Sequence, residues 1–194
     1  MSGGNSTPRR LEFRFSRPDD DKPAVPASVL IQTLEGAQRL IWLIALSREQ
    51  RDIKSRVRIP AEIEQRYQLR CEVPLSGSYV LPVFLQSVKP LPAALDQAVE
   101  VIDALKSVAV ALHNQDAGRV ASILPDSAIR RRVVEASQLL APKPGSGWLL
   151  DMAGNGTLVR LDDGWQRRIR HLYPPPPDAP TRETVNSELI EINF

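Results

Sequence analysis

The residue types that carry most enzyme chemistry are few in this chain and lie far apart. The 194 residues include two histidines, His113 and His171, and one cysteine, Cys71. No two of these have the spacing of zinc ligands, and no cysteine lies near a histidine. The acidic run at positions 19–21 sits between prolines and is interpreted as a solvated loop. The sequence therefore predicts neither a metal site nor a cofactor.

Residues that could act as a nucleophile or as an acid–base pair also have a plain structural interpretation. Serines flank a glycine in LSGSYVLP (75–82), and this arrangement is more typical of a hairpin turn than of a nucleophile. Asp151, Asp162 and Asp163 could do acid–base work, but acids at strand ends are also common turn formers. We therefore predict that the chain is not an enzyme.

Two basic clusters could contact phosphate groups. Their members are Arg48, Arg51, Lys54, Arg56 and Arg58, and then Arg167, Arg168 and Arg170. The second cluster lies between Trp165 and Tyr173, and basic side chains interleaved with aromatic rings can bind phosphates and stack on bases. The formal net charge is only +2, which favours the simpler interpretation that these basic side chains are solvated on exposed faces. Nucleic-acid binding is therefore the alternative hypothesis.

Aromatic and C-terminal apolar residues suggest a protein interface, because interfaces rely on such anchors. The candidate interface residues are Trp148, Trp165, Tyr173, Ile190, Ile192 and Phe194. The last three belong to TVNSELIEINF (184–194), whose alternation predicts a strand. This strand either closes the sheet of its own domain, which we favour, or adds to a neighbouring chain. We expect Trp42, which lies in LIWLIAL (40–46), to be in the core.

These candidate residues must be positioned by strands and helices that hydrophobic periodicity indicates. LEFRFS (11–16) alternates as a half-buried strand, and two further strands surround SGS (76–78). Because Pro74 and Pro82 lack a backbone donor, at least one of these two strands should lie at an edge or carry a bulge. Asn155-Gly156 predicts a tight hairpin turn. Long amphipathic helices are expected at about 26–51, at about 92–114 and after Pro125.

The composition agrees with an α+β fold. Hydrophobic residues make up 42% of the chain and aromatic residues only 5%, so the core must be aliphatic. We predict a mixed or antiparallel sheet of about five to seven strands packed against two or three long helices, with a C-terminal hairpin and a terminal strand. The expected divisions are a disordered tail (1–9), an α+β core domain (10–141), a hairpin with a short amphipathic segment (148–173), a proline spacer (174–180) and a terminal strand (181–194).

The expected location is the cytoplasm. One cysteine allows no intramolecular disulfide, which suits a reducing compartment. The first ten residues lack the apolar run of a secretory signal, and the longest apolar run, at 40–46, is far shorter than a membrane span. No membrane partner is expected.

The order of strand (LEFRFS), long apolar helix (LIQTLEGAQRLIWLIA), basic segment (RVRIP) and paired strands (LSGSYVLPV) is similar to the opening of a group of uncharacterised bacterial proteins. The similarity covers residues 11 to 85, and some members are encoded near anti-phage defence genes. It implies an accessory or interaction role, as in a subunit of a defence or mobile-element system, and transfers no active-site residue.

Together these patterns favour a non-catalytic, intracellular protein-binding or adaptor module. The residue types that catalysis requires do not occur in usable groups, whereas edge strands, a stiff spacer and a terminal strand are features of interfaces. The expected partner is another protein or a second copy of the chain.

Overall fold

The computed structural model describes residues 10–18, 24–49, 59–72, 79–86, 92–154 and 156–174, with the side chains of the helix that starts at 92 described from residue 97. The expected disordered tail (1–9), the terminal strand (181–194) and all but the first residue of the proline spacer (174–180) lie outside these ranges.

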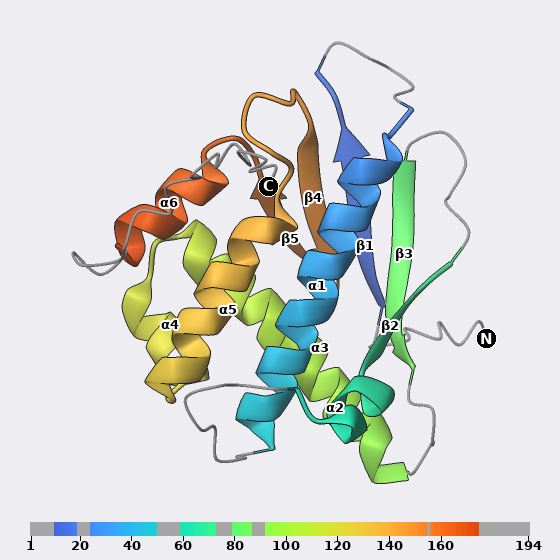
Figure 1. Cartoon of the computed structure of the whole chain (residues 1–194), viewed down its shortest axis with the longest axis vertical. Helices are drawn as coiled ribbons and strands as arrows, with labels where there is room; N and C mark the ends of the chain where they lie inside the picture. The colour runs from blue at the N-terminus through green and yellow to red at the C-terminus, as the bar shows by residue number, and fades with distance from the viewer. Residues whose placement is uncertain are drawn as a thin grey trace, which may run out of the picture.

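The described strands form one antiparallel five-stranded sheet in the order β2-β3-β1-β4-β5. In chain order the described elements are β1 (Arg10–Ser16), α1 (Ala27–Arg48), α2 (Ala61–Arg66), β2 (Gln68–Cys71), β3 (Tyr79–Gln86), α3 (Pro92–His113), α4 (Ala117–Ile123), α5 (Ser127–Leu140), β4 (Leu149–Gly154), β5 (Thr157–Leu161) and α6 (Trp165–Leu172). This arrangement confirms the predicted α+β class with an antiparallel sheet (Figure 1).

The two-residue alternation of β1 decides which face of the sheet is buried. Leu11, Phe13 and Phe15 are buried, whereas Arg14 on the opposite face is exposed. Phe13 lies beside Leu81 of β3 and Met152 of β4, and directly paired residues project to the same face. The inward face is therefore continuous across the three central strands.

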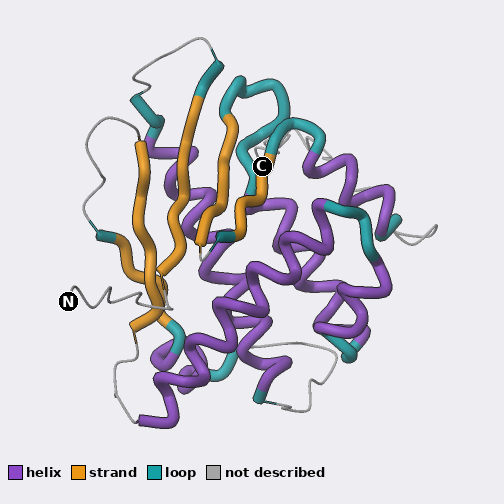
Figure 2. Tube along the Cα trace, turned by 180° about the vertical axis from the view of Figure 1, so that it is seen from behind, coloured by secondary structure: helices purple, strands orange, loops and turns teal. Residues whose placement is uncertain are grey.

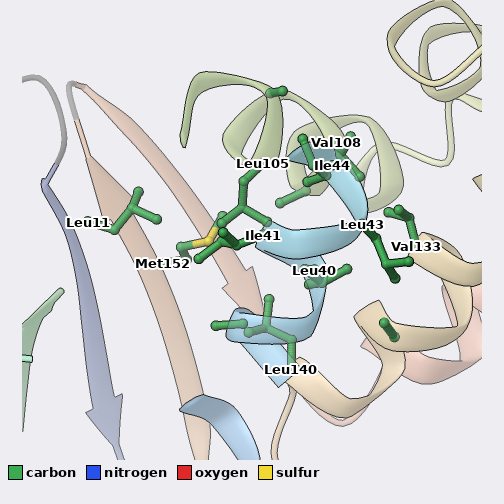
Figure 3. Close-up of a cluster of buried hydrophobic side chains, with 14 of the residues drawn as sticks. Leu11, Leu40, Ile41, Leu43, Ile44, Leu105, Val108, Val133, Leu140 and Met152 are labelled. Carbon is green, nitrogen blue, oxygen red and sulfur yellow. The ribbon is translucent and has the colours of Figure 1, made fainter. Parts of the chain in front are cut away.

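The helices pack against this inward face. The strands lie on one side of the molecule and the helices on the other (Figure 2). Leu11 and Met152 point from the sheet toward Ile41 of α1 and Leu105 of α3 (Figure 3). Most core side chains are aliphatic, as the low aromatic content predicts, but the three largest fully buried ones are the aromatic Trp165, Tyr67 and Phe13.

Helix α1 is the central helix, and its central residues are buried between the sheet, α3 and α5. By length and composition it could cross a membrane, although its longest uninterrupted apolar run has only seven residues. Half of its most apolar stretch is buried inside the protein.

Helices α1 and α5 approach each other at Gly36. A Cβ atom added there would lie 3.0 Å from the carbonyl carbon of Leu139 and from the amide nitrogen of Leu140. Beside this crossing, the Gln32 Nε2 atom donates to the carbonyl oxygens of Leu139 (3.3 Å) and Ala141 (2.9 Å) at the end of α5. The absence of a side chain at Gly36 allows the two helices to approach closely, and the Gln32 amide bonds the end of α5 to α1.

Aspartate caps begin the two helices that follow α3. The Asp126 side chain accepts from the backbone nitrogens of Ala128 and Ile129, so Asp126 rather than Ser127 caps α5. Asp116 accepts from the Arg119 nitrogen and begins α4, a helix that is not among those expected from the sequence. The cap and the buried Val120 stabilise this short helix.

The expected C-terminal hairpin is present, but it is part of the main sheet. Strands β4 and β5 pair across Gly156, whose φ of 77° suits the tight turn, and β4 pairs directly with β1. Leu150 and Ile169 belong to the same core cluster as α1. The expected boundary at residue 141 therefore does not separate two cores.

The sequence predicted an edge strand or a bulge from Pro74 and Pro82. Pro74 lies outside the described residues, but β2 is an edge strand, as expected for one of the two strands. Pro82 lies in the interior strand β3 opposite Glu72, one residue beyond the end of β2. The Glu72 nitrogen donates to the Pro82 carbonyl oxygen (2.9 Å). The N–H that proline lacks would have pointed to the same side, toward Glu72, just beyond the end of β2, so no hydrogen bond within the β2–β3 pairing is lost.

Candidate functional site

A mostly apolar groove of about 570 Å³ lies between helix α1 and the edge strand β2. Figure 1 shows α1 running between α5 on one side and β2 on the other. The described residues that line the groove are Leu34, Glu35, Gln38, Arg39, Trp42, Leu43, Ile59, Leu69, Cys71 and Arg132. Pockets of this volume and character commonly bind ligands or peptide side chains.

The helical repeat explains why one side of α1 forms a wall of this groove. Leu34, Gln38 and Trp42 are four residues apart, so their side chains follow one another along the same side of the helix. Glu35 and Arg39 continue this wall toward solvent, where both are exposed. The wall is thus apolar at Leu34 and Trp42, polar at Gln38 between them, and charged at its rim.

The Gln38 side chain attaches the start of β2 to this wall. Its Nε2 atom donates to the Tyr67 carbonyl oxygen (2.8 Å), and its Oε1 atom accepts from the Leu69 amide nitrogen (2.8 Å). One side-chain amide therefore satisfies a carbonyl and an N–H two residues apart, as a neighbouring strand would.

Beyond Leu69, the edge of β2 faces away from the rest of the sheet. The Glu72 nitrogen donates to Pro82, so in this antiparallel ladder the backbone groups of residues 68, 70 and 72 point toward β3. Those of Leu69 and Cys71 point the other way. The Leu69 carbonyl and both polar groups of the Cys71 backbone therefore lie along the open edge.

Two groups in the groove can report on its contents. Cys71, the single cysteine of the chain, is exposed, and partial burial raises the pKa of its thiol. The Trp42 ring is half-buried, and its buried Nε1 atom has no hydrogen-bond partner among the described residues. A buried donor without an acceptor costs about 1–3 kcal/mol.

A small polar network lies where α1, α2 and β2 meet. Arg66 Nη1 donates to Glu49 Oε1 (2.6 Å), and the Tyr67 hydroxyl donates to the same oxygen (3.2 Å). Burial, followed by the charge and the hydrogen bond of Glu49, raises the pKa of Tyr67 to about 12, although Arg66 opposes this change. The network fixes the position from which β2 begins.

Two of the three acidic residues weighed for catalysis, Asp151 and Asp162, form ion pairs with arginines. Asp151 accepts two hydrogen bonds from Arg160 across the β4–β5 hairpin (2.8 and 2.9 Å). Asp162 accepts from Arg168 (2.9 Å) and from the Gly164 nitrogen (2.9 Å). Burial alone would raise the pKa of Asp162, but Arg168 and the backbone donors outweigh it and lower that pKa. Neither acid lines the groove.

Within the described ranges, no three His, Cys, Asp or Glu side chains gather into a group that could hold a metal ion. His113 ends α3, and His171 lies on the exposed side of α6. The two histidines and Cys71 therefore lie on three different elements.

Two of the expected aromatic anchors are buried in the chain itself. Trp165 is fully buried, and its Nε1 atom donates to the Ser137 carbonyl oxygen (2.8 Å), because α6 turns Trp165 and Ile169 toward α5. Trp148 is 6% exposed, and Tyr173 is partly buried against the core. Neither tryptophan can serve as an exposed anchor. Ile190, Ile192 and Phe194 lie outside the described residues.

The basic candidates are only partly available. Arg48 is exposed in the last turn of α1, and Arg167 and Arg170 are exposed on α6, whereas Arg168 is half-buried against Asp162. The remaining members of the first cluster, Arg51, Lys54, Arg56 and Arg58, lie outside the described residues. Of the three arginines predicted to form a cluster on α6, two are therefore exposed.

The groove was not predicted from the sequence, because Trp42 was expected in the core. The apolar stripe of α1 is so wide that Leu34 and Trp42 look like its continuation. A usable signal was the polar residue Gln38 midway between them, which is unusual in a stripe that is buried on every side.

Comparisons with protein-family models, with curated proteins and with solved structures found no match for this chain. The resemblance of residues 11–85 to a bacterial group therefore stays a prediction. The groove remains the feature from which a function can be argued.

Proposed function

We propose that this chain is a non-catalytic adaptor of the bacterial cytoplasm that binds a protein partner in the α1–β2 groove. The observation that carries the proposal is the combination of an apolar wall on α1 with outward-facing backbone groups of β2. An extended segment can use both, since backbone bonds supply affinity and alternate side chains fill pockets.

The lining of the groove suits a binding surface better than a reaction site. The apolar wall includes Trp42, and tryptophan is enriched among the residues that dominate interface energies. The charged side chains Glu35 and Arg39 are at the rim, where charges guide association more than they add affinity. The similarity of residues 11–85 further suggests an accessory subunit of a defence or mobile-element system.

The test is affinity capture from the native host followed by a binding measurement with the captured partner. Trp42→Glu and, separately, Leu34→Glu should weaken binding at least about thirtyfold, which is the effect of losing a hot spot of about 2 kcal/mol. Leu158→Glu is the matched control, because Leu158 is 59% exposed on β5 at the opposite edge of the sheet.

Circular dichroism and thermal unfolding must first show that each variant is folded. A partner that binds both groove variants as tightly as the wild type would refute the proposed surface. If only Leu158→Glu abolishes binding of the partner, the binding surface lies on β5.

Nucleic-acid binding is a second candidate, supported by the exposure of Arg167 and Arg170 on the same side of α6. Binding through phosphates must weaken log-linearly with salt concentration. The double substitution Arg167→Glu and Arg170→Glu should then abolish binding of a fluorescent single-stranded oligonucleotide. Retained binding, or no binding by the wild type at low salt, would exclude this candidate.

A further inference from the structure

The groove sets three requirements for an occupant. It must be extended to pair with Cys71, it must place apolar side chains on alternate positions over Trp42 and Leu34, and it should carry negative charge. The last requirement follows from the charged residues of the lining, which are two arginines, Arg39 and Arg132, and one glutamate, Glu35.

A segment of this chain has the same three properties. Ile190, Ile192 and Phe194 occupy alternate positions, so a strand would place all three on one side. Glu183, Glu188 and Glu191 lie in residues 183–194, which contain no lysine or arginine. The segment is thus a strand candidate of charge −3, opposite in sign to the net charge of +1 that Arg39, Arg132 and Glu35 give the lining of the groove.

The described end of the chain lies within reach of the groove. Helix α6 packs on α5, because the Trp165 and Gln166 side chains donate to the carbonyl oxygens of Ser137 and Gln138. Arg132 of α5 lines the groove, and Figure 1 shows α5 and α1 between α6 and β2. The path to β2 therefore crosses α5 and α1, which is about 20 Å for two helices of ordinary diameter.

The intervening sequence is long enough for this path. Residues 174–182 include five prolines and favour polyproline II, which rises about 3.1 Å per residue and would span about 28 Å over nine residues. A stiff spacer of matching length also raises the effective concentration of the attached segment, typically to the millimolar range.

We propose that residues 183–194 bind in the α1–β2 groove of their own chain, with Ile190 and Ile192 over Trp42 and the backbone paired with Cys71. This inference rests on the proposed function of the groove as a docking surface. It makes the segment an intramolecular competitor of the partner, so binding of the partner requires release of the segment.

The test uses the full chain and the alkylation rate of its single cysteine, Cys71, by N-ethylmaleimide at fixed pH. The double variant Ile190→Asp and Ile192→Asp should react about tenfold faster than the wild type, which is the protection expected for an effective concentration of about 1 mM and a dissociation constant of about 0.1 mM. Ala179→Asp, a charge added to the spacer, should react at the wild-type rate.

A synthetic peptide of residues 183–194 added to the double variant should restore protection, and the same peptide with aspartate at positions 190 and 192 should not. Equal rates for the wild type and the double variant would overturn the proposal. Protection that increases with protein concentration would also overturn it, since the segment would then occupy a second copy.

Failure of this inference can be told apart from failure of the proposed function. If partner binding depends on Trp42 but is unchanged in the double variant, the segment is not the competitor and the function stands. If the segment protects Cys71 while the partner ignores Trp42→Glu, the intramolecular contact stands and the partner binds elsewhere. If both hold, the double variant binds the partner about tenfold more tightly than the wild type.

Discussion

Replacement of Gln38 should detach the beginning of β2 from helix α1. Gln38→Leu keeps the approximate size of the side chain but removes the bonds to the Tyr67 carbonyl and the Leu69 N–H, both 2.8 Å long. Each bond contributes about 1 kcal/mol net. We therefore expect a loss of about 2 kcal/mol in the free energy of unfolding, or about 6 °C in Tm for a domain of this size.

The assay combines guanidinium denaturation with residue-resolved amide hydrogen exchange. In the wild type the Leu69 amide should be protected by Gln38, whereas in Gln38→Leu it should exchange much faster, with the protection of β1 reduced only by the global loss of stability. Gln38→Glu separates the two bonds, because a carboxylate still accepts from Leu69 but cannot donate to Tyr67.

Gln32→Leu is a matched control on the same helix, because Gln32 holds the end of α5 rather than β2. It should leave the protection of the Leu69 amide unchanged. If Leu69 is equally protected in the wild type, Gln38→Leu and Gln38→Glu, the Gln38 side chain does not attach β2, and the geometry argued for the groove is incorrect.

Three further outcomes follow from the packing and the titrating groups. Gly36→Ala should lower the free energy of unfolding by about 1–3 kcal/mol in denaturant titrations, because its methyl group meets the α5 backbone, whereas Gly118→Ala, whose methyl group would meet the Asp116 carboxylate at an ordinary contact distance of 3.5 Å, should be neutral or slightly stabilising. Tyr67 should ionise last among the tyrosines, at about pH 12 by phenolate absorbance. Because its folded pKa is raised, the stability that it contributes is complete below about pH 10 and is lost as the pH rises to about 12, and Tyr67→Phe should remove this loss. The alkylation rate of Cys71 should keep rising above about pH 8.5, the pKa of an unperturbed cysteine, and a plateau at lower pH would contradict the burial of its thiol.

Much of the fold follows from local periodicity. The alternation of Leu11, Phe13 and Phe15 predicted β1 and its buried face, and Asn155-Gly156 predicted the β4–β5 turn. These predictions succeed because a strand or a tight turn is determined by neighbours in sequence. Helix α4 was missed since its cap, Asp116, outweighs the helix-breaking tendency of Gly118.

The candidate site could not be predicted from local periodicity. Its walls come from α1, β2, α5 and Ile59, and no local pattern states that Cys71 and Arg132 border one space. The tryptophans illustrate the limit, because a large aromatic ring is equally suited to a core and to an interface. Trp165 has Ile169 one turn away and turns inward, whereas Trp42 lies at the margin of a crowded stripe and lines the groove.

The order of the strands has a consequence for synthesis on the ribosome. Strand β1 is made first but occupies the middle of the sheet, and Phe13 pairs with Leu81 and Met152, which are 68 and 139 residues later. At about 5–20 residues per second, β1 waits on the order of ten seconds for its second neighbour. Such a high contact order slows folding and leaves an apolar strand without partners meanwhile. Chains released before residue 149 should therefore aggregate, and efficient production of the intact protein should depend on chaperones that hold the nascent chain.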